Sequence, residues 1–246
     1  CLARRAEKLA EAGYGPALLA LKKGFGQFDF VTGRVLSAAD IDSFIVAKLA
    51  DYCAYRLREF RADSREGDLL EMVSWNWQCE LGTRLQPPVR LNVVHPVIAD
   101  GRMQAHEWEL TQDGRLLKHD GLSHGDDHFF PGPCDIAWDL AGAIIEWDMD
   151  ERQQAEFLRR YHDLTGDCPE TRLPDYLITY AVFRMAWSKM AAEASWGSFD
   201  EALLRRDYQK YRAKAAELNV KRQLRAAAET TKPLAVSLPS ERLLGA

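Results

Sequence analysis

The sequence lacks the long apolar runs and the basic excess that mark two large classes of protein. No stretch approaches the roughly 20 apolar residues of a membrane-spanning helix, and no signal-peptide pattern opens the chain. The 32 Lys and Arg residues are outnumbered by 37 Asp and Glu residues, giving a net charge of -5. Because non-specific nucleic-acid binding needs a basic surface, we expect neither a nucleic-acid partner nor a membrane partner.

Cysteine is scarce and has no metal-binding spacing. The 5 cysteines lie far apart and form no Cys-x-x-Cys pair, which predicts reduced thiols and a cytoplasmic protein. An initiator methionine is also missing, and Cys1 opens directly on a helical pattern without an N-terminal cap. We therefore expect a longer polypeptide, in which an upstream domain would be a partner of this chain.

The sequence pattern divides the chain into a short β-rich section and a long helical section. A helix ending at Gly13 precedes two strand-like runs within residues 17–31. A buried strand is predicted over 89–98, and a small hairpin over 107–120 with Asp113-Gly114 as its turn. Apolar spacing predicts further helices over 41–60, 68–82, 136–147, 151–166, 174–194 and 199–228. The predicted fold class is α+β and mostly helical.

Two local signals refine this pattern. Ser37-Ala38-Ala39-Asp40 matches an N-terminal capping box, in which the first and last side chains satisfy free backbone amides. Trp75 and Trp77 lie within a helical pattern, which favours packing in the core over stacking on a ligand. We therefore predict that both tryptophans are buried.

The residue types that carry chemistry gather around the predicted hairpin. Asp120 follows a strand-like run directly and precedes Gly121. A strand end holds a carboxylate rigidly at the edge of a cleft, where phosphoryl transfer places magnesium on nucleotide phosphates. The glycine would let the chain leave the strand at a sharp angle. Asp-Gly is also a common turn, so these two residues alone are equally compatible with a surface turn.

A second block lies downstream of Asp120. Residues 132–141, Gly-Pro-Cys-Asp-Ile-Ala-Trp-Asp-Leu-Ala, are similar to the Gly-Asp-Pro-Ala-Tyr-Asp-Leu-Ala pattern of aminoglycoside phosphotransferases and choline kinases. With the order of strands and helices, the sequence resembles this protein-kinase-like family over residues 1–225. The resemblance implies that Asp135 caps a helix and that Asp139 braces the catalytic loop through backbone hydrogen bonds.

The same resemblance implies a two-lobed organisation. Residues 1–35 would be a remnant of the N-terminal lobe, residues 36–229 a helical C-terminal lobe that carries the catalytic hairpin, and residues 230–246 a flexible tail. Residues 24–36 resemble the strand that joins the lobes, so the backbone of Asp29, Phe30 and Val31 would contact adenine.

The resemblance also implies an activity, with ATP and Mg²⁺ as cofactors. The reaction would transfer the γ-phosphoryl group to a hydroxyl of a small-molecule acceptor. Asp120 would hold Mg²⁺, and Glu107 would assist it as a second oxygen ligand.

The sequence departs from the family pattern in two places. The glycine-rich phosphate loop and the strand lysine are absent from residues 1–246, so we expect this chain alone to turn over ATP weakly or not at all. In an ungapped register Arg102 falls at the catalytic Asp position, and Glu107 at the metal-binding Asn; the nearest carboxylate is Asp100. Either Asp100 orients or deprotonates the acceptor, or Arg102, which accepts no proton, leaves a pseudokinase-like binding module.

A third interpretation rests on a dense run of possible transition-metal ligands. These residues would make the protein a helical metal-dependent hydrolase; they are His124, Asp126, Asp127 and His128. Gly125 and the Phe-Phe-Pro that follows the run disfavour a helix there, so a polar loop is the alternative.

Overall fold

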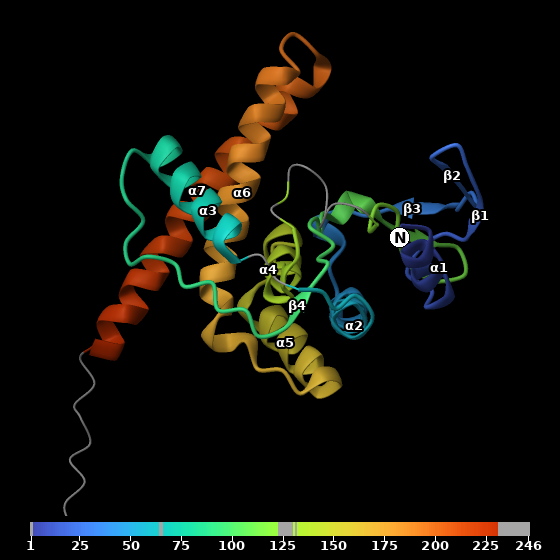
Figure 1. Cartoon of the computed structure of the whole chain (residues 1–246), viewed down its shortest axis with the longest axis horizontal. Coiled ribbons are helices and arrows are strands. Elements are labelled where there is room, and N and C mark those ends of the chain that lie inside the picture. The colour runs from blue at the N-terminus through green and yellow to red at the C-terminus, as the bar shows by residue number, and fades with distance from the viewer. Residues whose placement is uncertain (1, 64–65, 123–129, 131, 231–246) are drawn as a thin grey trace, which may run out of the picture.

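Helices dominate the computed structural model, which describes residues 2–63, 66–122, 130 and 132–230. Figure 1 shows the first helix and the first three strands at one end of the molecule and the long C-terminal helices at the other. The α-helices are α1 (Leu2–Glu11), α2 (Ser43–Glu59), α3 (Glu66–Leu81), α4 (Ala137–Glu146), α5 (Glu151–Thr165), α6 (Leu173–Ala194) and α7 (Phe199–Thr230). The predicted mostly helical α+β fold class is confirmed.

The first β element is the hairpin predicted within residues 17–31. Strand β1 (Leu18–Lys22) pairs antiparallel with β2 (Phe25–Phe28), and helix α1 contacts β1. Lys23 and Gly24 form the turn with φ of 53° and 84°, in the left-handed region that tight hairpin turns require. Both strands are largely exposed, so this hairpin extends from the helical body (Figure 1).

The second β element is a three-stranded antiparallel sheet in the order β3-β5-β6. Strands β5 (Trp108–Thr111) and β6 (Leu116–Lys118) form the predicted hairpin. Strand β3 (Gly33–Val35) adds an edge that the sequence did not predict. A Cβ atom on Gly33 would lie 2.5 Å from the Leu110 carbonyl oxygen, so only glycine allows the strands to approach this closely.

The helical body is built by long helices packed in pairs: α6 along α7, α2 on α5, and α3 and α4 on α6. The predicted Ser37–Asp40 capping box forms, but it opens a short 3₁₀ turn, η1 (Ala38–Asp40). Helix α2 begins three residues later, where the Asp42 carboxylate accepts the Ile45 amide hydrogen at 2.8 Å. The chain therefore uses two successive caps where the sequence suggested one.

The core is centred on α4, in which all ten residues are buried. Large aromatic side chains surround this helix; fully buried ones include Trp108, Trp138, Trp147, Tyr161, Tyr176, Tyr180 and Phe157. Trp77 belongs to this core at 4% exposure, whereas Trp75 is 71% exposed. The prediction for Trp75 was wrong because α3 packs against α6 and leaves another face open.

The prediction of a strand over residues 89–98 was also wrong for most of that segment. Only β4 (Pro96–Val97) forms, paired with β7 (Cys134–Asp135). The Val94 and His95 amides instead donate to one Asp135 carboxylate oxygen, each at 2.7 Å. Side-chain acceptors thus replace a β ladder and leave the segment irregular.

Two further chain features concern cysteines and membranes. Within the described residues, no helix is both long and apolar enough to cross a bilayer. Cys53, Cys79, Cys134 and Cys168 are free thiols. Cys1, the tail 231–246 and the His124–His128 run lie outside the described residues.

Candidate active site

Asp139 on α4 fixes the loop that holds the predicted catalytic residues. Its carboxylate is fully buried and accepts the backbone amide hydrogens of Asp100 at 2.8 Å and Gly101 at 3.2 Å. This confirms the predicted brace. Burial raises the pKa of Asp139 to about 6; nearby Arg56 lowers it and the Asp100 charge raises it further.

Asp135 organises the start of α4, as predicted. One carboxylate oxygen accepts the Ala137 amide hydrogen at 2.8 Å, and the other accepts the two amide hydrogens of the 94–95 segment. Arg172 also donates through Nε to Asp135 at 2.8 Å and through Nη2 to Asp167 at 2.6 Å. Asp135 therefore ties α4 to the chain before β4 and to the start of α6.

Asp100, the candidate catalytic carboxylate, lies inside the protein with no exposed surface. Tyr52 Oη donates to its Oδ2 at 2.5 Å, and the Arg102 amide donates to Oδ1 at 3.2 Å. Arg56 and Lys118 place cationic groups 3.6 and 3.5 Å from its oxygens. The carboxylate is thus fully satisfied by the chain itself.

Arg56 is a central residue that sequence reasoning missed. Its buried guanidinium donates to Tyr52 Oη and the Gly121 carbonyl, each at 2.9 Å, and to the Ile98 carbonyl at 2.8 Å. The guanidinium therefore joins the loop before Asp100 to the loop after the hairpin. The one sequence signal was a charged residue four positions after Tyr52 on the apolar face of the predicted helix.

Glu107 and Lys118 form a second buried pair, and Lys118 was also missed. Lys118 Nζ donates to Glu107 Oε2 at 2.6 Å, and Arg102 Nη1 lies 4.0 Å from Glu107 Oε1. The half-buried Arg102 guanidinium also stacks over the Trp187 ring on α6, 5.0 Å from its centroid. The signal for Lys118 was a cation ending the apolar run Leu116-Leu117.

Asp120 lies at the opening of this cluster, two residues after β6. The backbones of the two hairpin arms meet here, because the His119 amide donates to the Glu107 carbonyl at 2.9 Å. Asp120 is exposed, and its carbonyl accepts from Lys118 Nζ at 2.9 Å. Asp120 and Glu107 therefore lie on adjoining arms of the hairpin.

Gly121 has a different structural role from the predicted one. Its φ does not lie in the left-handed region; instead, a Cβ atom would lie 2.7 Å from Tyr52 Oη and 3.1 Å from Asp100 Oδ2. Glycine is thus needed because two polar side chains pack directly against the backbone, and not because the position requires a left-handed φ.

A cationic side chain of the protein already lies between Asp100 and Glu107 in this arrangement. Among the described residues, no three His, Cys, Asp or Glu side chains gather as a metal-binding group. The Lys118 ammonium already lies between the two carboxylates, 2.6 Å from Glu107 and 3.5 Å from Asp100. A divalent ion about 4 Å from this ammonium would meet a repulsion of roughly 8 kcal/mol at an effective dielectric constant of about 20.

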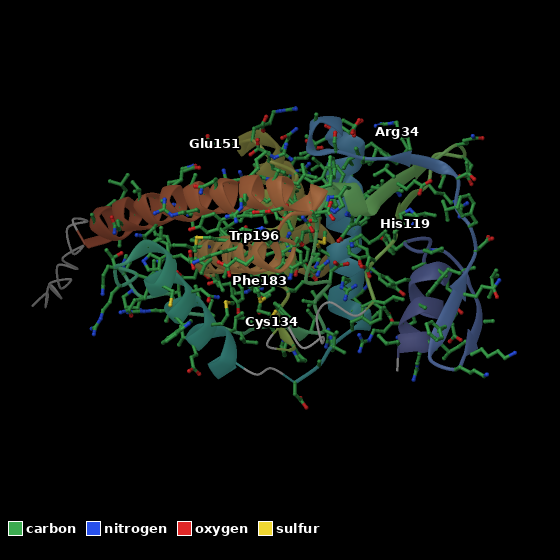
Figure 2. The ribbon with its side chains drawn as sticks, turned by 90° about the horizontal axis from the view of Figure 1, so that it is seen from above. Arg34, His119, Cys134, Glu151, Phe183 and Trp196 are labelled. Carbon is green, nitrogen blue, oxygen red and sulfur yellow. The ribbon has the colours of Figure 1, made fainter. Side chains whose placement is uncertain are left out.

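The predicted adenine-contact residues line two pockets beside the β3-β5-β6 sheet. A pocket of about 530 Å³ lies between Asp29–Gly33 and the side chains of Glu109 and His119. A second pocket, of about 310 Å³, lies between the same segment and Thr111–Arg115. Figure 2 labels His119, whose Nε2 lies 2.5 Å from Glu109 Oε2. The segment is therefore accessible next to the hairpin that carries Asp120.

An aromatic pocket of about 490 Å³ lies between α3 and α6. Trp75, Phe183 and Trp187 provide its aromatic surface. Glu193 and an ion pair between Glu80 and Lys189, 2.8 Å apart, provide its charged groups. Phe183 is labelled on α6 in Figure 2. Because Trp187 also stacks with Arg102, this pocket adjoins the candidate catalytic loop.

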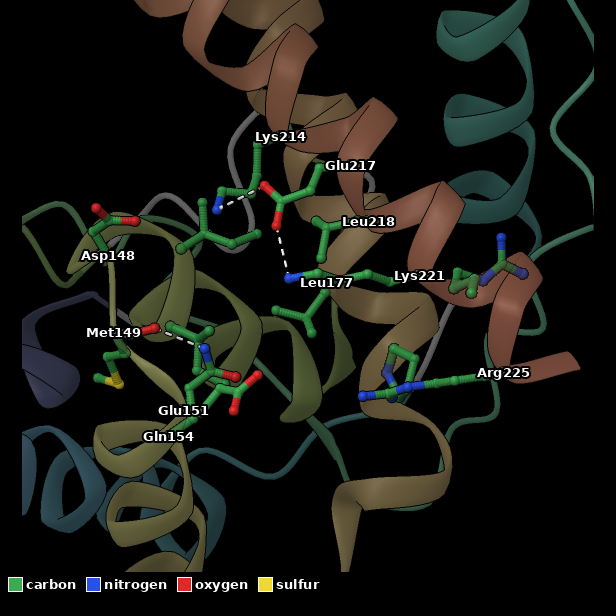
Figure 3. A pocket seen from close by; sticks show the side chains of 14 residues that line it. Asp148, Met149, Glu151, Gln154, Leu177, Lys214, Glu217, Leu218, Lys221 and Arg225 are labelled. Carbon is green, nitrogen blue, oxygen red and sulfur yellow. Dashed lines mark hydrogen bonds and ion pairs between the residues drawn. The ribbon is translucent and has the colours of Figure 1, made fainter. Parts of the chain in front are cut away.

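A further pocket, of about 290 Å³, lies between α4, α5, α6 and α7 (Figure 3). Glu217 holds Lys221 at 2.7 Å and Lys214 at 3.3 Å across part of it. None of the predicted site residues lines this pocket. Its basic groups are paired in part, and it is separate from the Asp100–Asp120 cluster because no residue of that cluster lines it.

The helical body, the Asp139-braced loop and the β5-β6 hairpin together define a protein-kinase-like fold. Solved structures support this: the choline kinase LicA of Streptococcus pneumoniae is 15% identical, with a TM-score of 0.57 over 87% of this chain and 79% of that chain. A choline/ethanolamine kinase family protein of Mesorhizobium loti is 14% identical, with a TM-score of 0.59 over 89% and 81%.

A choline kinase of Cryptosporidium parvum is 12% identical and reaches a TM-score of 0.61 over 92% of this chain and 80% of that chain. LicA has also been solved in complex with AMP, and that structure aligns with a TM-score of 0.51 at 14% identity over 87% and 77%. No family model and no curated protein sequence matches the chain. At these identities the comparisons show that the chain has the fold of these kinases.

Proposed function

We propose that the protein is an ATP-dependent phosphotransferase that acts on a hydroxyl group of a small molecule, in the cytoplasm. The observation that carries the proposal is the braced loop. The Asp139 carboxylate fixes the Asp100–Gly101 backbone beside the β5-β6 hairpin, within a kinase-like fold. Phosphoryl transfer depends mainly on positioning, and this brace positions the residues that would face the acceptor.

The nucleotide would bind in the pocket along Asp29, Phe30 and Val31. The pocket of about 530 Å³ there is large enough for a nucleoside and opens toward Glu109 and His119 on the hairpin. Phe30 is 89% exposed and offers an aromatic face for stacking. A phosphate chain extending from this pocket along the hairpin would lead toward Asp120.

The acceptor would bind in the aromatic pocket between α3 and α6. Trp75, which is 71% exposed, offers an aromatic face that attracts cations, and Glu193 adds negative charge. Trp187 already carries the Arg102 and Arg184 guanidinium groups, and Glu80 is paired with Lys189, so these two residues would shape the pocket. This combination favours an amine that also carries a hydroxyl group, such as the choline or ethanolamine named for the structural neighbours. Arg102, stacked on Trp187, would link this pocket to the catalytic loop.

Asp100 would orient the acceptor hydroxyl or accept its proton. In this structure its oxygens are held by Tyr52 and faced by two cations, so the acceptor cannot touch them without a change in the loop. Binding of the acceptor would therefore be accompanied by movement of residues 102–104, which follow the braced backbone. Arg102 accepts no proton and would contribute positive charge near the transferred group.

Calorimetric titration with ATP tests the nucleotide site. We expect saturable binding by the wild-type protein and at least tenfold weaker binding by Val31→Trp, which fills the pocket. Val35→Trp is the matched control, because Val35 is an exposed valine on β3. Absence of saturable binding by the wild type, or equal weakening in both variants, would contradict the proposal.

Transfer is measured separately, by ³¹P NMR of the phosphate monoester formed from choline or ethanolamine. The acceptor site predicts that Trp187→Ala raises KM for the amine more than it lowers kcat, because the ring shapes the acceptor pocket and does not react. A change confined to kcat would place the acceptor elsewhere.

A second candidate function is nucleotide binding without turnover. The observation that favours it is the pairing of Glu107 with Lys118 and Arg102, which leaves no oxygen pair for a metal between Asp100 and Glu107. This candidate predicts the same ATP titration with no phosphate monoester from either amine. The two assays together therefore separate it from the phosphotransferase.

A further inference from the structure

Lys118, the last residue of β6, has its whole side chain inside the protein. The residue is 2% exposed and its side chain has no accessible surface. Lysine is almost never fully buried unless it is paired, because an ammonium loses its hydration on burial. The backbone is fixed as well, since the Lys118 amide donates to the Tyr14 carbonyl at 2.7 Å. The ammonium is thus held at one place in the site.

Three oxygen atoms surround this ammonium, and a lysine ammonium has three hydrogens to donate. Nζ lies 2.6 Å from Glu107 Oε2, 2.9 Å from the Asp120 carbonyl oxygen and 3.5 Å from Asp100 Oδ1. Carboxylate and carbonyl oxygens are also the ligands of hard divalent cations such as Mg²⁺. The lysine is therefore surrounded by a set of oxygens that a metal ion would use.

The charges of the side chains inside the cluster are balanced without a metal, while the Asp120 carboxylate lies exposed at its opening. Three carboxylates and three cationic side chains meet here: Asp100, Glu107 and Asp139 with Arg56, Arg102 and Lys118. A divalent ion added to this set would leave two uncompensated positive charges at a largely buried place. Removal of the Lys118 charge would instead leave one carboxylate in excess and free the oxygens of Glu107.

We propose that the Lys118 ammonium is a built-in cation that fills a divalent-metal position between Asp100 and Glu107. The chain itself thereby keeps Mg²⁺ out of this position. The consequence for nucleotide rests on the proposed function: ATP binding does not depend on a metal ion held by Glu107. Lys118 is thus the residue that sets the cation requirement of the site.

Direct binding of Mn²⁺, followed by the electron paramagnetic resonance signal of the free ion, tests the proposal without nucleotide. Lys118→Met removes the ammonium and keeps a side chain of similar length. We expect Lys118→Met to bind Mn²⁺ at least tenfold more tightly than the wild type. The double variant with Glu107→Gln is the matched control and should lose this gain.

Two outcomes overturn the proposal. The first is a Mn²⁺ site on the wild-type protein that Glu107→Gln abolishes, because Glu107 would then already be a metal ligand. The second is unchanged Mn²⁺ binding in Lys118→Met. If Lys118→Met does not fold, the comparison of wild type with Glu107→Gln still decides, with equal Mn²⁺ binding as the expected result.

A separate ATP titration distinguishes failure of this inference from failure of the proposed function. We expect the change in ATP affinity between EDTA and Mg²⁺ to be the same in the wild type and in Glu107→Gln. An affinity for ATP that falls at least tenfold in EDTA and is restored by Mg²⁺ only when Glu107 is intact overturns the inference while supporting nucleotide binding. Lack of ATP binding under both conditions refutes the proposed function and leaves the Mn²⁺ comparison valid.

Discussion

Replacement of Gly121 by alanine tests whether close packing holds the candidate site together. The new Cβ atom would lie 2.7 Å from Tyr52 Oη and 3.1 Å from Asp100 Oδ2, both shorter than ordinary contacts. Tyr52 cannot move away freely, because its hydroxyl donates to Asp100 at 2.5 Å and accepts from Arg56 at 2.9 Å. The substitution must therefore disturb at least one buried hydrogen bond.

The expected cost follows from two contributions. Overpacking of a tight interior costs about 1–3 kcal/mol, and a buried polar group that loses its partner costs about 1–3 kcal/mol more. Alanine also lowers the chain entropy of the unfolded state, which offsets about 0.4–1 kcal/mol of this destabilisation. We expect Gly121→Ala to lower the free energy of unfolding by roughly 2–4 kcal/mol, which shifts the urea midpoint to lower concentration.

A double-mutant cycle identifies the clashing atom. Tyr52→Phe removes the hydroxyl, so Gly121→Ala should cost about 1–2 kcal/mol less when combined with Tyr52→Phe than in the wild type. Gly15→Ala is the matched control, because its Cβ would meet only ordinary contacts at 3.5 and 3.8 Å. A Gly121→Ala protein as stable as the wild type, or an additive cycle, would refute the packing argument.

Three further predictions concern charged residues. The pKa of Asp139 is raised from 3.8 to about 6 in the folded protein, so folding favours the protonated carboxyl group. Its contribution to the free energy of unfolding is therefore complete below about pH 4 and is lost as the pH rises through 6. The unfolding free energy of the wild type relative to Asp139→Asn should therefore fall by roughly 3 kcal/mol over that range, and a constant difference would refute the burial argument. Arg172→Met should cost about 3–5 kcal/mol in urea unfolding because it leaves Asp135 and Asp167 without their buried cation, and a cost below about 1 kcal/mol would contradict this. Asp120→Asn should abolish phosphate transfer while changing the free energy of unfolding by no more than about 1 kcal/mol, because interactions of exposed charges contribute little to stability; equal transfer rates would remove Asp120 from the site.

The sequence predicted those parts of the fold that depend on local chemistry. The Asp113-Gly114 turn located the β5-β6 hairpin, and apolar spacing located the helices within a few residues. The roles of Asp135 and Asp139 followed from the resemblance to the family motif, because Asp139 acts on the distant backbone of Asp100 and Gly101. The hairpin turn and the helices, by contrast, could be recognised without knowing which distant segments meet.

Features that depend on distant contacts could not be predicted in this way. Arg56 and Lys118 are charged residues in apolar patterns. Their burial is explained by distant partners, such as Gly121, which lies 65 positions away from Arg56. Strand β3 is three residues long and exists because it pairs with β5. The segment 89–98 had the composition of a strand, but the Asp135 carboxylate binds its amides instead.

The complete burial of α4 has a consequence for motion at the site. Amide hydrogens of such a helix exchange with solvent only when the whole domain opens, so α4 should be among the slowest-exchanging segments. Asp139 lies on this helix, so its backbone is expected to keep its position on the timescale of ligand binding. Rearrangement around Asp100 must therefore come from the loop beyond these two backbone hydrogen bonds. Hydrogen exchange should show residues 102–104 opening while α4 stays protected.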